Sequence, residues 1–182
     1  MCDIPTGQTH RLNQTKTMKD YFKKNERMDY KMLETFNEHT HIFDTLRQAK
    51  EGHHTDAIGT HTSKLGEKRT FNIELKRRFI NLDTYPSIYI EDYKLGSMLL
   101  DYMMFGIEPL YVNFLNDNTV VIFNLNKLSK YPKLDIKNIN SEGKERTQLQ
   151  SRRYCLSFDD AVIYHNYNLI KPLGECKTKI YS

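Results

Sequence analysis

An alternating stretch in the first half of the chain decides the fold. It reads Thr70-Phe71-Asn72-Ile73-Glu74-Leu75-Lys76-Arg77-Arg78. Apolar residues occupy every second position from Phe71 to Leu75, and polar residues lie between them. Because a strand places successive side chains on opposite faces, this pattern predicts a strand with one buried and one polar face. The polar face carries Glu74 and Lys76, about 7 Å apart along the strand.

Other recognisable elements lie on both sides of this strand. We expect a helix over 17–50, a short strand over 56–60, a turn at 63–67, an extended segment over 87–91, a helix over 92–105, and a β-hairpin made of 110–115 and 119–124. Apolar residues at helical spacing predict the helices, and two β-rich runs around an Asn/Asp turn predict the hairpin. This order predicts a mixed α/β domain around one sheet.

Length and composition limit the kind of protein. The chain has 182 residues, 27 Lys or Arg and 23 Asp or Glu, with a formal net charge of +4. This length fits one domain, and so small a charge permits a nucleic-acid partner without requiring one. The N-terminus does not resemble a secretory signal, and no apolar run approaches the ~18 residues of a membrane span. We therefore expect a cytoplasmic protein without membrane association. The three cysteines, far apart and odd in number, fit neither a disulfide framework nor a CxxC metal site.

Changes in composition predict the domain boundaries. Residues 1–16 are polar, and we expect them to form a flexible N-terminal arm. Residues 17–170 are expected to form the domain, with a long loop at 129–151 because that segment is rich in Lys, Asn and Glu. Residues 159–168 fit either a helix or a strand. Residues 171–182 are expected to form a C-terminal tail.

The acids near the alternating strand form the main candidate site. Asp56 stands at the start of the preceding strand, so a turn between the two strands would bring it close to Glu74. Two converging carboxylates attract a hard divalent cation such as Mg²⁺. A nearby lysine can orient or deprotonate a water while the metal stabilises charge on a phosphoryl oxygen, which is the chemistry of phosphodiester hydrolysis. Six Asp/Glu-x-Lys triplets occur in the chain, and only the one at Glu74 has both a clean strand and an acid on another strand before it.

These residues resemble the core of a known superfamily. Asp56, a short hairpin and the segment Phe71–Arg78 look like the motif of the restriction-endonuclease-like superfamily, the PD-(D/E)xK nucleases. The resemblance covers about residues 30–125. It implies a central mixed sheet flanked by helices, with an α-β-β-β-α-β core. Thr55 stands where the name of the motif has Pro.

The resemblance also implies roles for individual residues. The implied metal ligands are Asp56, Glu74 and the backbone carbonyl of Leu75. Asp56 and Glu74 are also implied catalytic residues, together with Lys76 as the catalytic lysine. Members of the superfamily often take a further acid from the first helix, and by position it would be Glu34 or Glu38. The implied cofactor is Mg²⁺, for which Mn²⁺ can substitute.

Basic residues around the strand are candidates for nucleic-acid binding. Arg77 and Arg78, with Lys68 and Arg69 near the start of the strand, fit contacts with phosphates, and they fit an ordinary basic surface equally well. Lys94 opens the helix after the motif, where the resemblance often places a polar site residue. It also fits a plain charge pattern at a helix start.

We therefore expect a Mg²⁺-dependent endo- or exodeoxyribonuclease that hydrolyses phosphodiester bonds in DNA, with a homodimer left open. The alternative is a non-catalytic module that keeps the nuclease fold and binds nucleic acid or protein. A third option is a small structural or assembly protein in which the pair Glu74 and Lys76 is accidental. Metal-dependent cleavage separates the first hypothesis from the others, because only an active site loses cleavage when Glu74 is removed.

Overall fold

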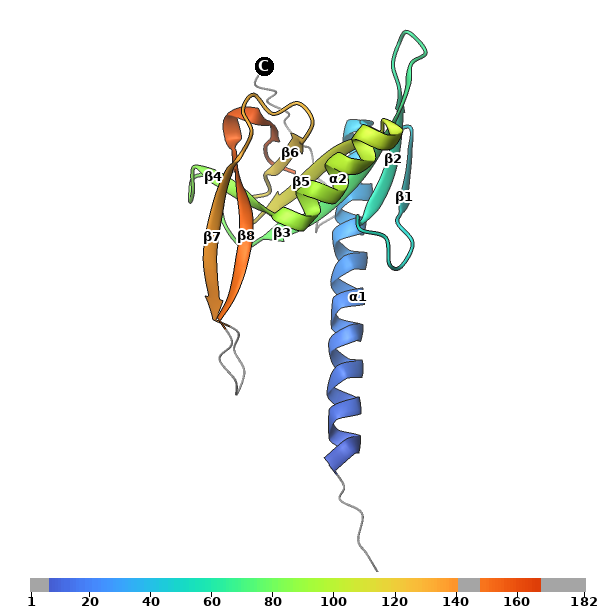
Figure 1. Cartoon of the computed structure of the whole chain (residues 1–182). Coiled ribbons are helices and arrows are strands. Elements are labelled where there is room, and N and C mark those ends of the chain that lie inside the picture. The colour runs from blue at the N-terminus through green and yellow to red at the C-terminus, as the bar shows by residue number, and fades with distance from the viewer. Residues whose placement is uncertain (1–6, 141–147, 168–182) are drawn as a thin grey trace, which may run out of the picture.

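The structure, a computed structural model, describes residues 7–140 and 148–167, and the exposure of side chains over 23–136 and 152–167 (Figure 1). The elements are α1 Gly7–Thr40, β1 Thr45–Gln48, β2 Ala57–Thr62, β3 Lys68–Arg78, β4 Ser87–Glu91, α2 Asp92–Phe105, β5 Glu108–Leu115, β6 Val120–Asn124, β7 Lys133–Asn140, β8 Gln148–Ser157, the 3-10 turn η1 Phe158–Asp160, and β9 Ala161–Tyr164. The fold is mixed α/β. Neither α-helix in the described ranges has the length and apolar character needed to cross a membrane.

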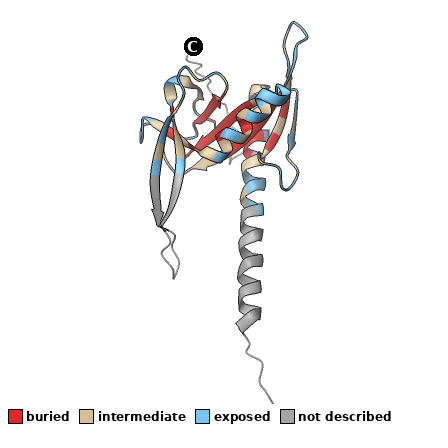
Figure 2. Cartoon of the chain, in the orientation of Figure 1, coloured by how far each residue is buried: buried red, intermediate tan, exposed pale blue. Residues whose placement is uncertain are grey.

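Two sheets make up the body of the molecule. The larger sheet has six strands in the order β1-β2-β3-β5-β6-β9, and the smaller sheet has three in the order β4-β8-β7. β3 and β5 are central and parallel, while their other neighbours in the larger sheet run antiparallel. The segment containing β4 and α2 connects them, because parallel neighbours need a crossover. β5 is buried along almost its whole length because it lies in the centre of the larger sheet (Figure 2).

A separate apolar cluster covers each face of the larger sheet. Phe36 of α1 packs on one face, together with Leu75 of β3. Leu95 of α2 packs on the other face, together with residues of β4 and β8. Because side chains alternate along β3, its apolar residues point toward α1, and Glu74 points toward α2. The candidate site therefore lies on the α2 face.

Several predicted elements are confirmed. The alternating strand is β3, and the helix predicted over 92–105 is α2 with the same bounds. α2 ends because Gly106 takes a left-handed conformation, with a φ of 69°, which glycine adopts without strain. The predicted hairpin is β5 and β6, and Asn118 in its turn has a φ of 58°. The strand predicted over 87–91 is β4, but it lies in the second sheet, so the prediction of a single sheet is wrong.

The N-terminal helix differs from its prediction at both ends. α1 begins at Gly7, inside the segment predicted as an arm at 1–16, of which residues 1–6 lie outside the described residues. It ends at Thr40 rather than at residue 50. The side chain of Asn37 binds the backbone of Phe43, donating to its carbonyl oxygen at 3.0 Å and accepting from its N–H at 2.8 Å. These bonds turn the chain out of the helix and into β1.

The C-terminal third also differs from its prediction. The segment predicted as a long loop at 129–151 contains β7 and the start of β8. Leu134 and Ile136 alternate with polar residues, yet they are 40% and 54% exposed. A ribbon that buries so little lacks the apolar content by which a strand is recognised in a sequence. The undecided segment 159–168 begins within η1 and continues into β9, and the tail predicted at 171–182 lies outside the described residues.

Candidate functional site

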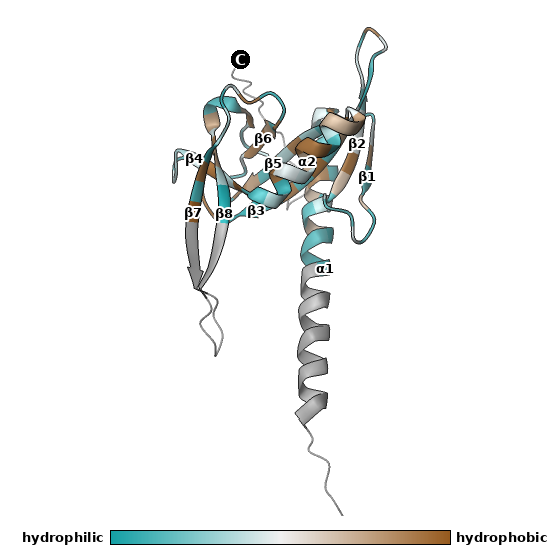
Figure 3. Cartoon of the chain, in the orientation of Figure 1, coloured by the Kyte–Doolittle hydropathy of each residue, from teal (hydrophilic) through white to brown (hydrophobic). Residues whose placement is uncertain are grey.

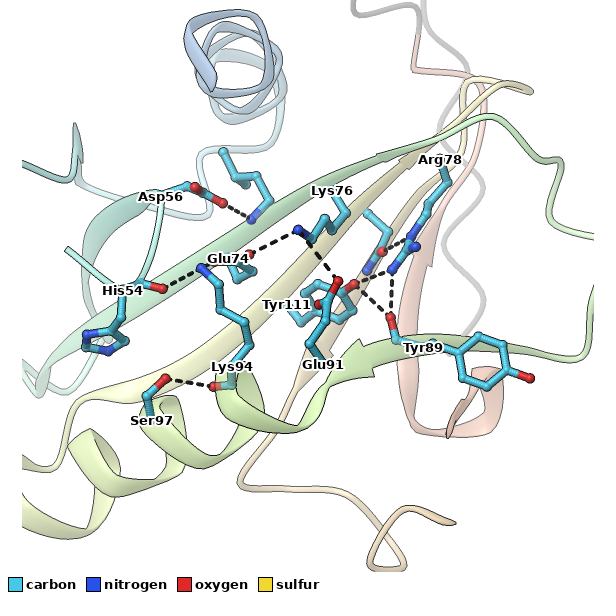
Figure 4. Close-up of polar contacts among 12 residues, drawn as sticks. His54, Asp56, Glu74, Lys76, Arg78, Tyr89, Glu91, Lys94, Ser97 and Tyr111 are labelled. Carbon is cyan, nitrogen blue, oxygen red and sulfur yellow. Dashed lines mark hydrogen bonds and ion pairs between the residues drawn. The ribbon is translucent and has the colours of Figure 1, made fainter. Parts of the chain in front are cut away.

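Glu74 is the one charged residue that is buried within the described ranges, with its side chain only 2% exposed. Lys94 Nζ donates a hydrogen bond to Glu74 Oε2 at 2.7 Å, and Lys76 Nζ lies 3.5 Å from Oε1 (Figure 4). Lys94 Nζ also donates to the carbonyl oxygen of His54 at 2.6 Å. The carboxylate is thus held between two ammonium groups, one from its own strand and one from α2.

Asp56 is fixed against the strand that carries Glu74. Its backbone N–H donates to the carbonyl oxygen of Ile73 at 3.0 Å, and its Oδ2 accepts from the N–H of Leu75 at 2.7 Å. These two bonds hold the acid just before β2 at a defined place along β3. The hairpin geometry predicted this proximity, and the structure brings Asp56, Glu74 and Lys76 into one region.

The pKa of Glu74 reflects this environment. Burial raises the pKa of its carboxyl from 4.5 to about 7, and the negative charge of Asp56 acts in the same direction. The bonds from Lys94 and Lys76 oppose this rise without cancelling it. Burial also disfavours the charge of Lys94, but its bond to Glu74 outweighs that effect and raises the pKa of the ammonium. Near neutral pH the carboxyl is therefore poised between two charge states, and an added cation would favour its ionised form.

The acid that α1 contributes is not one of the two predicted. Glu34 and Glu38 are both exposed, and Glu34 is hydrogen-bonded to Tyr30 rather than to the site. Asp29 lies closer, since its Oδ1 is 3.6 Å from Nε of Arg77. Burial raises the pKa of Asp29, Arg77 opposes the rise, and the negative charge of Asp56 adds to it. Asp29 precedes the buried Met32 by three residues and so shares the sheet-facing side of the helix, but this spacing alone does not mark it as a site residue.

Glu91 is a site residue that the sequence pattern did not single out. It ends β4, and its Oε1 lies 4.0 Å from Lys76 Nζ. Its Oε2 is buried and has no hydrogen-bond partner within the described part of the chain. Lys76 thus lies between Glu74 and Glu91 (Figure 4). Across the described ranges, however, no three His, Cys, Asp or Glu side chains come close enough together to hold a metal ion on their own.

An open hollow gives access to Asp56 from the α1 side. It has a volume of about 510 Å³ and lies between α1 and the connection from β1 to β2. Lys23 and Arg27 of α1 line it, and Lys23 Nζ reaches Glu51 across it at 3.4 Å. Asp56 can therefore be reached by small ions and by solvent, whereas Glu74 is enclosed by the protein.

The two arginines predicted to bind phosphates have partners within the protein. Arg78 donates to the carbonyl oxygen of Tyr89 at 2.6 Å, to Asn113 Oδ1 at 3.2 Å and to the hydroxyl of Tyr111. It thereby ties together β3, β4 and β5. Arg77 donates to Asn25 Oδ1 at 3.2 Å, which ties β3 to α1. Both side chains support the walls of the site.

The structure does not bring Lys68 and Arg69 to the site. They begin β3, and the eight steps along the strand from Lys68 to Lys76 span ~26 Å. Arg69 is paired with Glu67 at 3.1 Å and with Glu108 at 3.4 Å. That Lys68 and Arg69 contact phosphates stays a prediction, at a distance from Lys76 that the length of the strand sets.

Comparisons with known proteins add little to this geometry. No family model and no curated protein matches the chain. A solved structure of Hjc, a Holliday junction resolvase from the archaeal hyperthermophile Archaeoglobus fulgidus, is similar over 62% of this chain and 80% of that chain. The sequence identity is 11% and the TM-score is 0.36. A likeness of this degree supports no inference, so the function must be argued from the contacts of the site.

Proposed function

We propose that this protein is a metal-dependent nuclease of the restriction-endonuclease-like fold, which hydrolyses phosphodiester bonds in DNA. The observation that carries the proposal is the placement of Asp56 beside the strand of Glu74, whose buried carboxyl has a pKa raised to about 7. The order α1, β1, β2, β3, α2 and β5, with β3 parallel to β5, supports the proposed fold. In this assignment β1 supplies a core strand in place of the segment predicted at 87–91.

The residues present fit a magnesium ion. Asp56 and Glu74 provide two carboxylates whose negative charges repel each other. This repulsion adds to the effect of burial in raising the pKa of Glu74, and a cation between the two would relieve it. Mg²⁺ is commonly held by one or two carboxylates, with water and substrate phosphates completing its shell. Asp56, Glu74 and the carbonyl of Leu75 would hold the ion, and Mn²⁺ would suit the same oxygen donors. When bound, the metal supplies stabilisation of the negative charge that develops on the phosphoryl oxygens.

The lysines then have distinct tasks. Lys76 Nζ, placed between Glu74 and Glu91, donates a hydrogen bond to the attacking water and orients it toward the phosphorus. Glu91, 4.0 Å away, holds this ammonium in position. Lys94 neutralises Glu74 before substrate arrives and so limits the cost of burying that carboxylate.

Cleavage assays test the proposal. We expect the purified protein to cut at least one of four labelled DNA substrates (duplex, four-way junction, flap and single strand) in Mg²⁺ or Mn²⁺. Glu74→Ala and Lys76→Ala should abolish cutting, while Glu38→Ala, at an exposed acid of α1, should retain it. Circular dichroism verifies that each variant is folded. The proposal is overturned if no substrate is cut, or if the site variants cut as fast as the unaltered protein.

One observation favours the non-catalytic alternative, a nucleic-acid-binding module that retains the fold. The ammonium of Lys94 already neutralises Glu74 and is anchored by the carbonyl oxygen of His54, so the site is satisfied without a metal. This alternative predicts DNA binding without cleavage, no rise in melting temperature with millimolar Mn²⁺ or Ca²⁺, and unchanged DNA binding in Glu74→Gln. A cation bound to the native state would instead raise its stability.

A further inference from the structure

β7 and β8 form a two-stranded ribbon that extends away from the body of the molecule (Figure 1). β4 pairs with β8 only as far as Arg153, whereas the pairing of β7 with β8 continues to Asn140 and Gln148. The far part of the ribbon therefore has no third strand beside it. The two strands contain four basic residues against a single acid, Asp135; the basic residues are Lys133, Lys137, Arg152 and Arg153.

The N-terminal part of α1 projects in a similar way. The apolar residues by which α1 packs on the sheet fall between Tyr30 and Phe36, among the positions whose exposure is described. Residues 7–27 contain six Lys or Arg and two acids, whereas residues 28–40 contain one Lys and three acids. Residues 23–27 still contact the body, since Asn25 accepts from Arg77 at 3.2 Å and Lys23 Nζ lies 3.4 Å from Glu51. At 1.5 Å per residue, the part of the helix before them is ~24 Å long.

The candidate site lies between the points at which these two projections leave the body of the molecule. Asp29 of α1 is paired with Arg77, the neighbour of Lys76. Arg152 of the ribbon lies 3.4 Å from Asp92, the neighbour of Glu91. Both projections extend toward the same side of the molecule in Figure 1, and the coloured part of the ribbon carries both hydrophilic and hydrophobic residues in Figure 3.

We propose that ribbon β7–β8 and residues 7–27 of α1 are two arms that hold a nucleic-acid duplex across the site. The proposal rests on the proposed function for the chemistry and adds to it the form of the substrate. A two-stranded ribbon fits the major groove of B-DNA, which is about 12 Å wide. Lysine and arginine side chains on both arms would neutralise backbone phosphates, the interaction that dominates affinity for DNA.

A duplex suits these arms better than a second copy of the chain. A coiled coil of two α1 helices needs apolar residues at alternating spacings of three and four positions. Met18, Tyr21, Met28 and Met32 fall on such positions, but Asn25 interrupts this stripe, and Arg11 and Gln14 occupy its positions nearer the N-terminus. Two copies would also bring arms of the same charge together. A long negatively charged ligand relieves this repulsion, and a duplex is wide enough to meet two separate arms.

Fluorescence anisotropy with a labelled 20-bp duplex tests the proposal, in EDTA so that no cleavage occurs and at a series of salt concentrations. The ribbon variant is Lys133→Gln with Lys137→Gln, and the helix variant is Lys16→Gln with Lys19→Gln. The matched control is Lys31→Gln with Lys64→Gln, which removes two exposed lysines that lie outside both arms. Each arm variant should reduce the magnitude of the slope of log K against log salt by about 2, because each lost phosphate contact contributes about 0.9. The control should leave the slope unchanged.

Three results would overturn the proposal: an unchanged slope in both arm variants, an equal loss in the control, or tighter binding of a single strand than of the duplex. Sedimentation showing a dimer that the arm variants dissociate would assign the arms to a second copy and would also overturn it. Arm-dependent duplex binding without cleavage in Mg²⁺ would leave this inference standing and remove the nuclease function. Cleavage that does not depend on the arms would overturn this inference and leave the nuclease function standing.

Discussion

Replacing Glu74 by Gln isolates the free energy of burying a carboxylate at the site. In the native protein, burial and the charge of Asp56 raise the pKa of Glu74 from 4.5 to about 7. The folded state therefore binds this proton more tightly than the unfolded state does. The associated stability is fully present below pH 4.5 and is lost as the pH rises through 7. Gln carries no charge at any pH, so Glu74→Gln should not show this loss.

The size of the effect follows from the shift. One pKa unit corresponds to about 1.4 kcal/mol, so the rise from 4.5 to about 7 amounts to about 3 kcal/mol above neutral pH. We subtract the free energy of unfolding of the variant from that of the unaltered protein. This difference should fall by about 2–3 kcal/mol between pH 5 and pH 8. The ion pairs with Lys94 and Lys76 form only with the ionised carboxylate, and their effect is already contained in the pKa of about 7, so they add no further dependence on pH.

Urea unfolding at pH 5, 6, 7 and 8 in EDTA measures the difference directly. Glu38→Gln serves as the control, because Glu38 is exposed and its replacement should give a nearly flat difference. A difference between the unaltered protein and Glu74→Gln that stays constant with pH would refute the reasoning. Such a flat difference would mean that the two lysines hold the pKa of Glu74 at or below its ordinary value of 4.5, so that the carboxyl is ionised in both the folded and the unfolded state across this range.

Three further substitutions probe the site and its support. Lys94→Met removes the ammonium that competes for Glu74 and should raise Mn²⁺ affinity in calorimetry; weaker binding would mean that Lys94 organises the site instead. Arg78→Met removes the donor to Asn113 Oδ1 and to the hydroxyl of Tyr111, while the Tyr89 carbonyl oxygen keeps its bond from Tyr111. It should lower the free energy of unfolding by about 2–3 kcal/mol, against less than about 0.5 kcal/mol for the exposed Lys68→Met. Gly59→Ala would place a methyl group 2.7 Å from the Phe43 ring and should cost about 1–3 kcal/mol in the same assay; a neutral result would show that the ring moves freely.

The centre of the fold was predictable because its elements have a clear pattern of apolar and polar residues and clear ends, although the central strands β3 and β5 are buried on both faces. Apolar and polar residues alternate along β3, as expected for a strand. α2 ends at Gly106, as its sequence predicts. The ribbon was missed because it projects from the body and buries few apolar side chains. The end of α1 was missed because it depends on the side chain of Asn37 binding a backbone six residues away, which no local pattern indicates.

The candidate site was predictable where it follows from one strand and its hairpin neighbour. The alternation of β3 put Glu74 and Lys76 on one face, and the hairpin brought Asp56 beside them. Glu91 and Asp29 come from elements whose packing against β3 is set by tertiary contacts, so spacing along the chain did not reveal them. The sequence also did not show that Arg78 is occupied by internal acceptors, since these lie on β4 and β5.

The central claim is that Asp56 and Glu74 together form a divalent-cation site that serves hydrolysis. Electron paramagnetic resonance of Mn²⁺ at pH 7.5 counts the ions bound by the unaltered protein, Asp56→Asn, Glu74→Gln and Glu38→Gln. We predict that the unaltered protein and Glu38→Gln bind Mn²⁺ and that each of the other two variants loses it. Equal Mn²⁺ binding in all four proteins, or none in the unaltered protein, would contradict the account.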